Sequence, residues 1–352
     1  MTAEFFSTSS RHIQIVMIMK GFSSRMIELL SGLLEDKARY HEVETAEYPP
    51  DPNHKQGWSS AGAPTIFFDN ATGDYYVSLR QRAPQATGSA PSRGYKWEMF
   101  RKKANDLLTP WTKVWELKTS DVAGKKLASV EGVSLRKYED AYHYYFCWTD
   151  ASTEWMTGYV VTDSIDGIRT ELKNSGNWQE IMKGKDPKVM KFENKYYMVI
   201  SNSLIESDSP CFLEYNILMD RNFHEPYSRR FGIITSSTGP IFYDEDLHRY
   251  VYWGNSRHEE EIYWYTMTSK NLKDWSLDWR KNVFNWGYSN NNTARYFDLS
   301  ITDEDIVFCM EWDHNKDFAG STFVWQYENF AGDRDMPKNS DLIKSQFERP
   351  KA

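Results

Sequence analysis

A pattern of short apolar strands, polar turns and aromatic pairs recurs along this chain. Each unit has an opening residue, an apolar run, a polar or acidic turn, and then an aromatic or apolar pair. The openings are spaced by about 50 to 70 residues, which is the length of a four-stranded propeller blade with its loops. The pattern therefore predicts an all-β, five-bladed β-propeller. The predicted openings are Ala63, Glu131, Asp186, Thr238-Gly239 and Asp298.

The turn within each unit separates two strands and predicts a hairpin, as at 69–73. Third strands are expected at Tyr95 to Phe100, Gly158 to Val161, Phe212 to Tyr215 and Ile262 to Met267. The repeat fills 58–330 and is expected to form one propeller domain. Residues 1–57 lie outside the repeat and predict a short N-terminal α/β arm with a linker. Residues 331–352 are polar and predict a C-terminal tail.

Composition narrows the range of partners. Aromatic residues make up 16% of the chain, which suits sheets packed face to face on flat side chains. A net charge of −8 without a dense basic block argues against nucleic acid or an anionic membrane as a partner. Ile13 to Met19 is too short for a secretory leader, so we expect a cytoplasmic location. Each cysteine, at 147, 211 and 309, lies in an apolar or aromatic stretch and predicts a buried, unpaired thiol.

The predicted propeller brings two sets of side chains to one rim of its central channel. The inner strand of each blade starts at that rim, and its antiparallel neighbour returns to it. Carboxylates, guanidinium groups, amides and tryptophans meeting there provide the stacking and hydrogen bonds that a carbohydrate substrate requires. The predicted catalytic residues are Glu131, Asp186 and Asp298. The predicted substrate-binding residues are Arg80, Arg82, Arg93, Trp148, Asn202, Asn255, Arg257, Trp312 and His314.

These assignments have structural alternatives. Glu131 also fits a strand residue paired with an arginine, and Asp186 also fits a turn-initiating residue before proline. The arginines fit two roles, gripping an anionic group of a ligand or neutralising the carboxylates across the mouth. The chain has no Gly-rich phosphate loop, His-Glu-x-x-His helix or paired Cys-x-x-Cys motif. We therefore expect no cofactor and no metal among the site residues, and the sequence leaves open a structural metal in the channel.

One segment resembles a known group of enzymes. Asp186 to Val199 resembles the third-blade segment of glycoside hydrolase family 43, whose Asp orients and tunes the catalytic acid. Ser269 to Trp275 is similar to a polar turn common in these propellers. The resemblance is to the five-bladed propeller glycoside hydrolases, the group that contains families 32, 43, 62, 68, 117 and 130. It covers about 58–329 at the level of pattern.

The chain departs from those families at particular openings. Family 43 has an Asp general base where this chain has Ala63, and a Glu acid where it has Thr238-Gly239. Family 130 resembles the first two blades better, with an Arg ending a first-blade strand and a catalytic Asp where this chain has Gly132. That leaves Glu131 as the nearest candidate acid. The resemblance therefore implies a divergent member of the group.

The leading hypothesis is a glycoside hydrolase with Glu131 as general acid, and with Asp186 tuning it or acting as base. The second hypothesis is a glycoside phosphorylase in which the arginines form a phosphate pocket. The third is a carbohydrate-binding propeller without catalysis, and a polysaccharide lyase stays possible. The sequence gives no expectation for the oligomeric state.

Overall fold

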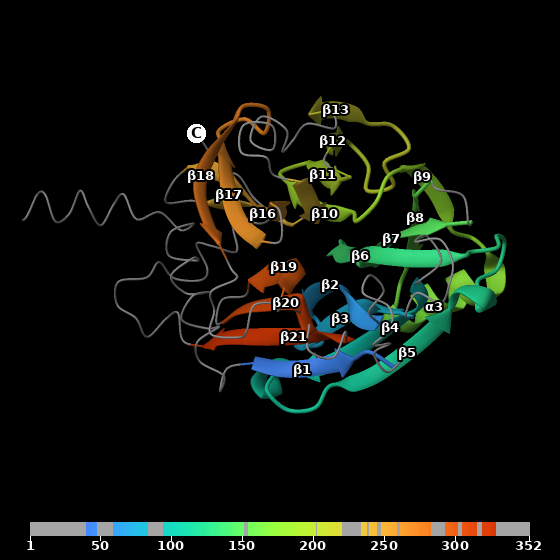
Figure 1. Cartoon of the computed structure of the whole chain (residues 1–352). Coiled ribbons are helices and arrows are strands. Elements are labelled where there is room, and N and C mark those ends of the chain that lie inside the picture. The colour runs from blue at the N-terminus through green and yellow to red at the C-terminus, as the bar shows by residue number, and fades with distance from the viewer. Residues whose placement is uncertain are drawn as a thin grey trace, which may run out of the picture.

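The computed structural model describes twelve segments of the chain and arranges their strands in five small antiparallel sheets around a ring (Figure 1). The fold is therefore the five-bladed β-propeller that the repeat predicts. The described residues are 40–47, 59–83, 94–150, 154–201, 203–219, 234–237, 239–244, 248–258, 261–282, 293–301, 305–314 and 319–328. The predicted C-terminal tail lies outside them, as does most of the predicted arm.

Each blade is an antiparallel meander whose first strand lies innermost. The first blade contains β2 (Ser59–Asp69), β3 (Asp74–Arg82), β4 (Gly94–Lys103) and β5 (Thr112–Lys118). The second contains β6 (Ser129–Tyr138), β7 (Ala141–Thr149), β8 (Met156–Thr162) and β9 (Gln179–Lys183). The third contains β10 (Lys188–Phe192), β11 (Lys195–Ile200), β12 (Ser203–Ser207) and β13 (Asn216–Met219).

The fourth blade has a divided inner strand. Its members are β14 (Ile234–Ser237), β15 (Ile241–Asp244), β16 (Arg249–His258), β17 (Glu261–Ser269) and β18 (Trp275–Asn282). Both β14 and β15 pair with β16. The fifth blade contains β19 (Thr293–Ile301), β20 (Asp305–His314) and β21 (Ala319–Glu328). Helical turns are η3 (Ala104–Asp106), η4 (Thr119–Asp121), α3 (Ile165–Thr170) and η5 (Glu171–Ser175).

An N-terminal strand completes the fifth blade. Strand β1 (Tyr40–Thr45) pairs antiparallel with β21, from Tyr40 opposite Trp325 to Thr45 opposite Ser321. It supplies the fourth strand, because a ring built from one chain needs one blade that joins its two ends. The pairing also covers the edge of β21. This corrects the predicted boundary at residue 57, since part of the predicted arm belongs to the propeller.

Aromatic side chains fill the space between neighbouring blades. Between the first and second blades, the ring of Trp97 meets that of Phe146 edge to face at 5.0 Å. Tyr138 meets Tyr196 in the same way at 4.9 Å between the second and third blades. Such contacts add to the free energy of burying the rings. The high aromatic content of the sequence is therefore used at the interfaces between blades.

The third strand of the third blade differs from the prediction. The predicted strand at Phe212 to Tyr215 is wrong, because β12 supplies that strand and these residues form the connection to β13. The thiols of Cys147, Cys211 and Cys309 are free, as predicted. Cys147 and Cys309 are buried as expected, whereas Cys211 is only partly buried. Among the described residues, no helix has the length and apolar character to cross a membrane.

Candidate active site

A β-bulge interrupts the pairing near the start of the inner strand in several blades. It lies between Gly62 and Thr65 in β2, between Val130 and Val133 in β6, and between Arg295 and Phe297 in β19. A bulge places one extra residue in a strand and re-aims its side chain. The bulges therefore mark equivalent openings at one rim of the channel.

Backbone dihedrals identify the same position. Ala63, Asp186 and Tyr296 have positive φ values of 50°, 57° and 49°, in the left-handed region that non-glycine residues rarely adopt. Such residues cost free energy and concentrate at functional sites. The structure thus places Ala63, Glu131 and Asp186 at equivalent openings. In the fifth blade the equivalent residue is Tyr296.

Asp298, which the sequence predicts to open the fifth blade, therefore lies two residues after the opening residue. It is level with Thr65 of the first blade, whose hydroxyl donates to its Oδ2 at 2.6 Å. Its carboxylate is fully buried and also contacts Arg136 Nη2 at 3.3 Å and Lys188 Nζ at 3.5 Å. Burial alone raises the pKa of Asp298, but the charges of Arg136 and Lys188 outweigh it and lower the pKa. Its surroundings are those of a buried structural ion pair.

Replacing Asp298 with asparagine is expected to destabilise the fold. The change removes the charge that balances Arg136 and Lys188, and breaking a buried pair in this way costs about 3 kcal/mol. We expect the free energy of unfolding, measured in urea, to fall by about that amount. The exposed Asp140→Asn in the β6–β7 turn is the control and should change it by less than about 0.5 kcal/mol. An unchanged stability for Asp298→Asn would contradict this structural role.

Arg80 is the hub of the charged side chains at the openings. Its guanidinium is fully buried, and its Nε donates to Glu131 Oε2 at 2.8 Å. Nη2 contacts Glu311 Oε2 at 3.3 Å, and Nη1 donates to Ser60 Oγ at 2.7 Å. The structure therefore gives Arg80 the neutralising role that the sequence left open.

Glu311 is a residue of this cluster that the sequence did not single out. It lies on β20, and its Oε2 accepts a hydrogen bond from the Ala63 amide at 2.8 Å. A Cβ on Gly62 would lie 2.0 Å from the same oxygen, so glycine there makes room for the carboxylate. The carboxylate of Glu311 thus lies at the first-blade opening, where the side chain of Ala63 has no carboxyl group. Only the fold reveals this, because the two residues are 248 positions apart.

Glu131 is held in its ionised form. Burial alone would raise its pKa, but the charges of Arg80, Lys185 and Arg82 hold the pKa of Glu131 well below its usual range. Arg82 Nη2 lies 3.7 Å from Glu131 Oε1. An acid of this kind has no proton to donate near neutral pH. This is at odds with the predicted role of Glu131 as general acid.

The pKa of Asp186 is displaced in the opposite direction to that of Glu131. Burial raises its pKa, with Lys185 opposing and the Glu131 charge adding to the increase. Its backbone amide donates to Cys147 Sγ at 3.4 Å. A Cβ on Gly132 would come within 2.6 Å of Asp186 Oδ1, so the chain approaches the carboxyl group closely there. Two carboxyl groups whose pKa values diverge in this way can divide the roles of proton donor and ionised partner.

The ionised Glu131 predicts acid sensitivity of the fold. Because its folded pKa lies below the unfolded value of 4.5, its contribution to stability is complete above pH 4.5 and is lost as the pH falls below it. We expect Glu131→Gln to flatten the decline of unfolding free energy between about pH 4.5 and 3, by at most about 1.4 kcal/mol per pH unit. Denaturation at several pH values measures this slope. An unaltered slope would contradict the depressed pKa.

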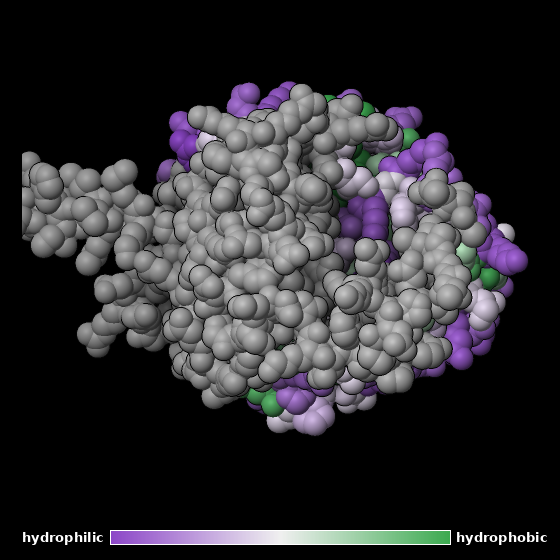
Figure 2. All heavy atoms as spheres, in the orientation of Figure 1, coloured by the Kyte–Doolittle hydropathy of each residue, from purple (hydrophilic) through white to green (hydrophobic). Residues whose placement is uncertain are grey.

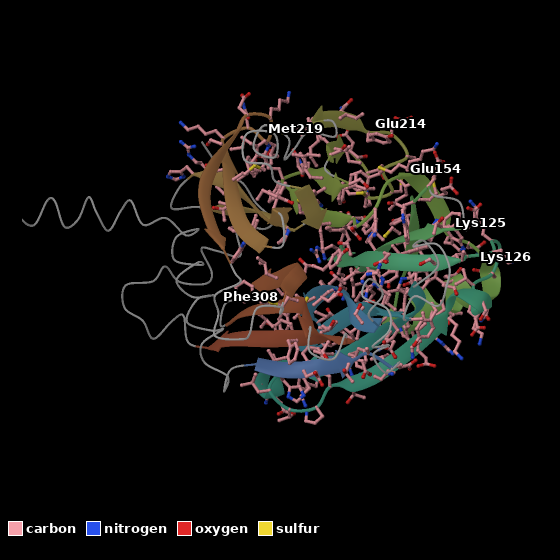
Figure 3. The ribbon with its side chains drawn as sticks, in the orientation of Figure 1. Lys125, Lys126, Glu154, Glu214, Met219 and Phe308 are labelled. Carbon is pink, nitrogen blue, oxygen red and sulfur yellow. The ribbon has the colours of Figure 1, made fainter. Side chains whose placement is uncertain are left out.

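Trp148 does not face the mouth, contrary to the prediction. Its ring is buried and meets Trp178 edge to face at 5.4 Å, and Lys125 Nζ lies 4.9 Å from its centroid. Figure 3 shows Lys125 at the outer edge of the molecule, away from the centre of the ring. Strand alternation turns this side chain into the packing between blades.

The remaining predicted binding residues fall partly or wholly outside the described structure. Arg93 and Asn202 lie outside the described residues. Asn255, Arg257, Trp312 and His314 are described for their backbone alone, on the last residues of β16 and β20. Those strand ends return to the rim where the inner strands open. Figure 2 shows hydrophilic side chains in a hollow near the middle of the ring.

One group of carboxylates in the described part of the chain has the spacing of metal ligands. Oxygens of Glu47, Glu98 and Glu116 lie within 4.8 Å of one another. Lys96 Nζ contacts all three carboxylates, with distances of 2.9 Å to Glu98 and 3.1 Å to Glu116. The lysine charge takes the place that a cation would otherwise fill. This cluster links β4 and β5 of the first blade to Glu47.

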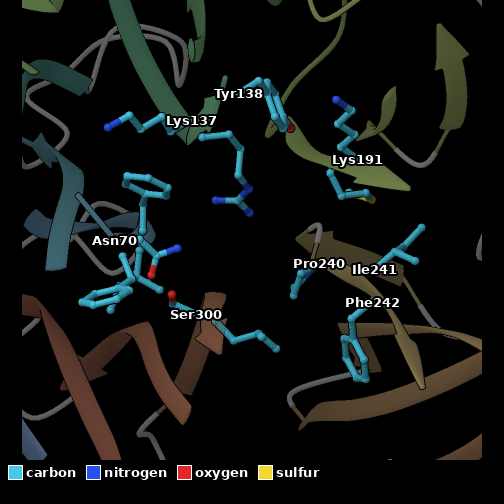
Figure 4. Close-up of a pocket in the computed structure, with 14 residues that line it drawn as sticks. Asn70, Lys137, Tyr138, Lys191, Pro240, Ile241, Phe242 and Ser300 are labelled. Carbon is cyan, nitrogen blue, oxygen red and sulfur yellow. The ribbon is translucent and has the colours of Figure 1, made fainter. Parts of the chain in front are cut away.

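A cavity of about 100 Å³ lies near the other ends of the inner strands. Figure 4 shows side chains from several blades around it, including Tyr138, Lys191 and Phe242. Arg136 also lines it, but its guanidinium is already bound to Asp298 and to the backbone oxygen of Val189. We therefore assign the chemistry to the rim with Glu131 and Asp186.

Comparison with solved structures finds enzymes of the same fold. The RS223 β-xylosidase superposes with a TM-score of 0.53 at 11% identity, covering 77% of this chain and 92% of that one. The GH43_1 enzyme from Xanthomonas citri in complex with xylotriose gives 0.51 at 11% identity, covering 84% and 93%. Its xylose complex gives 0.50 at 9% identity, covering 84% and 93%. These structural neighbours are glycoside hydrolases, and at such identities the likeness establishes the propeller fold.

Neither a scan of protein-family models nor a search of curated proteins gave a match for this sequence. The structural likeness therefore stands without a detectable likeness in sequence.

Proposed function

We propose that this protein is a glycoside hydrolase that cleaves an O-glycosidic bond at the rim where the inner strands open. One observation carries the proposal: two carboxyl groups at equivalent openings, Glu131 and Asp186, have pKa values displaced in opposite directions. Glycoside hydrolysis uses such a pair, one group protonated and one ionised. The structural neighbours with this fold are themselves glycoside hydrolases.

In the proposed reaction, Asp186 is the proton donor and Glu131 is the ionised partner. Asp186 gives its proton to the glycosidic oxygen as the bond from that oxygen to the anomeric carbon breaks. The Glu131 carboxylate stabilises the positive charge that develops on the sugar. Water supplies the new hydroxyl at the anomeric carbon, and its remaining proton restores Asp186. These roles reverse the prediction made from the sequence.

Other residues position this pair. Arg80 holds Glu131 in place through Nε, and its neighbouring Nη2 contacts Glu311. Arg80 therefore acts as a positioning residue. The phosphorylase hypothesis requires arginines that are free to bind phosphate. The guanidinium of Arg80 is already paired with protein carboxylates, so Arg80 does not fill this role. The geometry favours hydrolysis over phosphorolysis.

A substrate screen tests the proposed function. Purified protein is incubated with chromogenic glycosides, neutral and acidic, and with xylo-oligosaccharides, since the structural neighbours include a β-xylosidase. Each substrate is tested with and without inorganic phosphate. We expect hydrolysis that does not depend on phosphate. Strict dependence on phosphate would instead support the phosphorylase, and binding without any product would support a non-catalytic propeller.

A further inference from the structure

Two cationic side chains beside Glu131 and Asp186 lack full pairing within the described structure. The Nε of Arg82 is buried and has no hydrogen-bond partner among the described residues. Its only ion pair there is the 3.7 Å contact of Nη2 with Glu131. A buried donor of this kind costs free energy unless a ligand satisfies it. Arg82 thus has an unsatisfied Nε, and its side chain is 16% exposed to solvent.

Lys185 is the second such group. It directly precedes Asp186, and its side chain is half-buried. Within the described part of the chain its ammonium forms no ion pair, and it lies 4.8 Å from the centroid of the Trp155 ring. Its pKa is raised by the nearby Glu131 and Asp186, which outweigh the effect of burial. The ammonium therefore stays charged.

Among the described residues, the charges at this rim do not balance when Asp186 carries its proton. Arg80, Arg82 and Lys185 are positive, whereas Glu131 and Glu311 provide the carboxylates that pair with Arg80. An uncharged sugar offers hydroxyl groups to this site but no countercharge. A substrate oxyanion would complete the hydrogen bonding of Arg82 and balance the charge, and a planar guanidinium edge suits a carboxylate in particular.

We propose that the sugar bound at this site carries an acidic group, and that Arg82, with Lys185, recognises it. The substrate class is then a glycoside of a uronic acid or of a sulfated sugar, which share a negatively charged oxyanion. This inference rests on the proposed function for its placement beside Glu131 and Asp186. Arg82 acts in it as a specificity-determining residue.

Binding to a non-hydrolysing variant tests this inference separately from catalysis. Titration calorimetry with Asp186→Asn protein compares each uronide with its neutral counterpart, such as methyl β-glucuronide with methyl β-glucoside. A sulfated monosaccharide and inorganic phosphate are titrated in parallel. We expect the acidic sugar to bind at least about tenfold more tightly, because a charged hydrogen-bonded pair is worth more than a neutral one. Added NaCl should weaken this preference.

Variants on the same background assign the preference to residues. Arg82→Gln should reduce the preference to less than about threefold, and Lys185→Met should reduce it in the same direction. Arg101→Gln, on the exposed face of β4, is the matched control and should preserve it. Circular dichroism confirms that each variant is folded.

The outcomes separate this inference from the proposed function. Equal or tighter binding of neutral sugars overturns the inference, even if the wild-type protein hydrolyses them. A preference that survives Arg82→Gln and Lys185→Met also overturns it. Binding of phosphate in place of the acidic sugars overturns it in favour of a phosphate site. Preferential binding of acidic sugars supports it whether or not the screen detects turnover, whereas absence of turnover on every glycoside counts against the proposed function alone.

Discussion

Replacing Asp186 with asparagine is expected to lower kcat/KM on oligosaccharides by about 10² to 10⁴-fold, the usual contribution of a positioned general acid. Asparagine keeps the shape of the side chain but has no acidic proton. The loss should depend on the leaving group. A dinitrophenyl glycoside, whose leaving group departs without protonation, should lose much less than an oligosaccharide whose sugar alkoxide needs the proton.

Rates for both kinds of substrate, measured with wild-type and Asp186→Asn protein, check this prediction. The exposed Asp140→Asn controls for a general effect of replacing a carboxylate. Equal losses on the two substrates would exclude proton donation as the role of Asp186. The wild-type rate should also fall as the pH rises through the raised pKa of Asp186, because only the protonated form donates.

Replacing Arg80 with methionine is expected to produce the largest loss of stability. The change leaves the carboxylates of Glu131 and Glu311 buried without their shared countercharge, and breaking such a pair costs about 3 to 5 kcal/mol. The free energy of unfolding in urea should fall by this amount. Arg101→Met, at an exposed position of β4, should change it by less than about 0.5 kcal/mol.

A double variant separates lost charge balance from lost packing. Adding Glu131→Gln to Arg80→Met removes one of the orphaned carboxylates, so the double variant should be more stable than the sum of the single effects predicts. Strict additivity would show that the destabilisation comes from the missing arginine stem. A loss below about 1 kcal/mol for Arg80→Met would contradict the role of Arg80 as the hub of the cluster.

The fold was predictable from the sequence because the propeller repeats one supersecondary unit. Ala63, Glu131 and Asp186 each open an apolar run, and this regularity alone predicts that they occupy equivalent openings. Strand β1 was missed because it contributes one isolated strand, and its pairing with β21 spans nearly the whole chain. No local pattern shows which strand closes a ring.

The site was only partly predictable. Asp298 was misplaced by two residues because its blade is irregular and the bulge at Tyr296 cannot be seen in the sequence. Glu311 was missed because its proximity to Ala63 depends on the glycine at position 62 and on the way the blades meet. The reversal of acid roles between Glu131 and Asp186 was also hidden, since it depends on distances to Arg80 and Lys185. The residue types predict which chemistry is available at the rim. The packing around them determines which carboxyl group is protonated and which is ionised.

The most direct test of the account is a proton NMR time course of oligosaccharides with wild-type and Asp186→Asn protein in phosphate-free buffer. The oligosaccharides are acidic and neutral pairs, including xylotriose. We expect new anomeric signals of free sugar with the wild-type protein, and almost none with the variant over the same time. Unchanged anomeric signals with the wild-type protein, despite line broadening that reports binding, would contradict it.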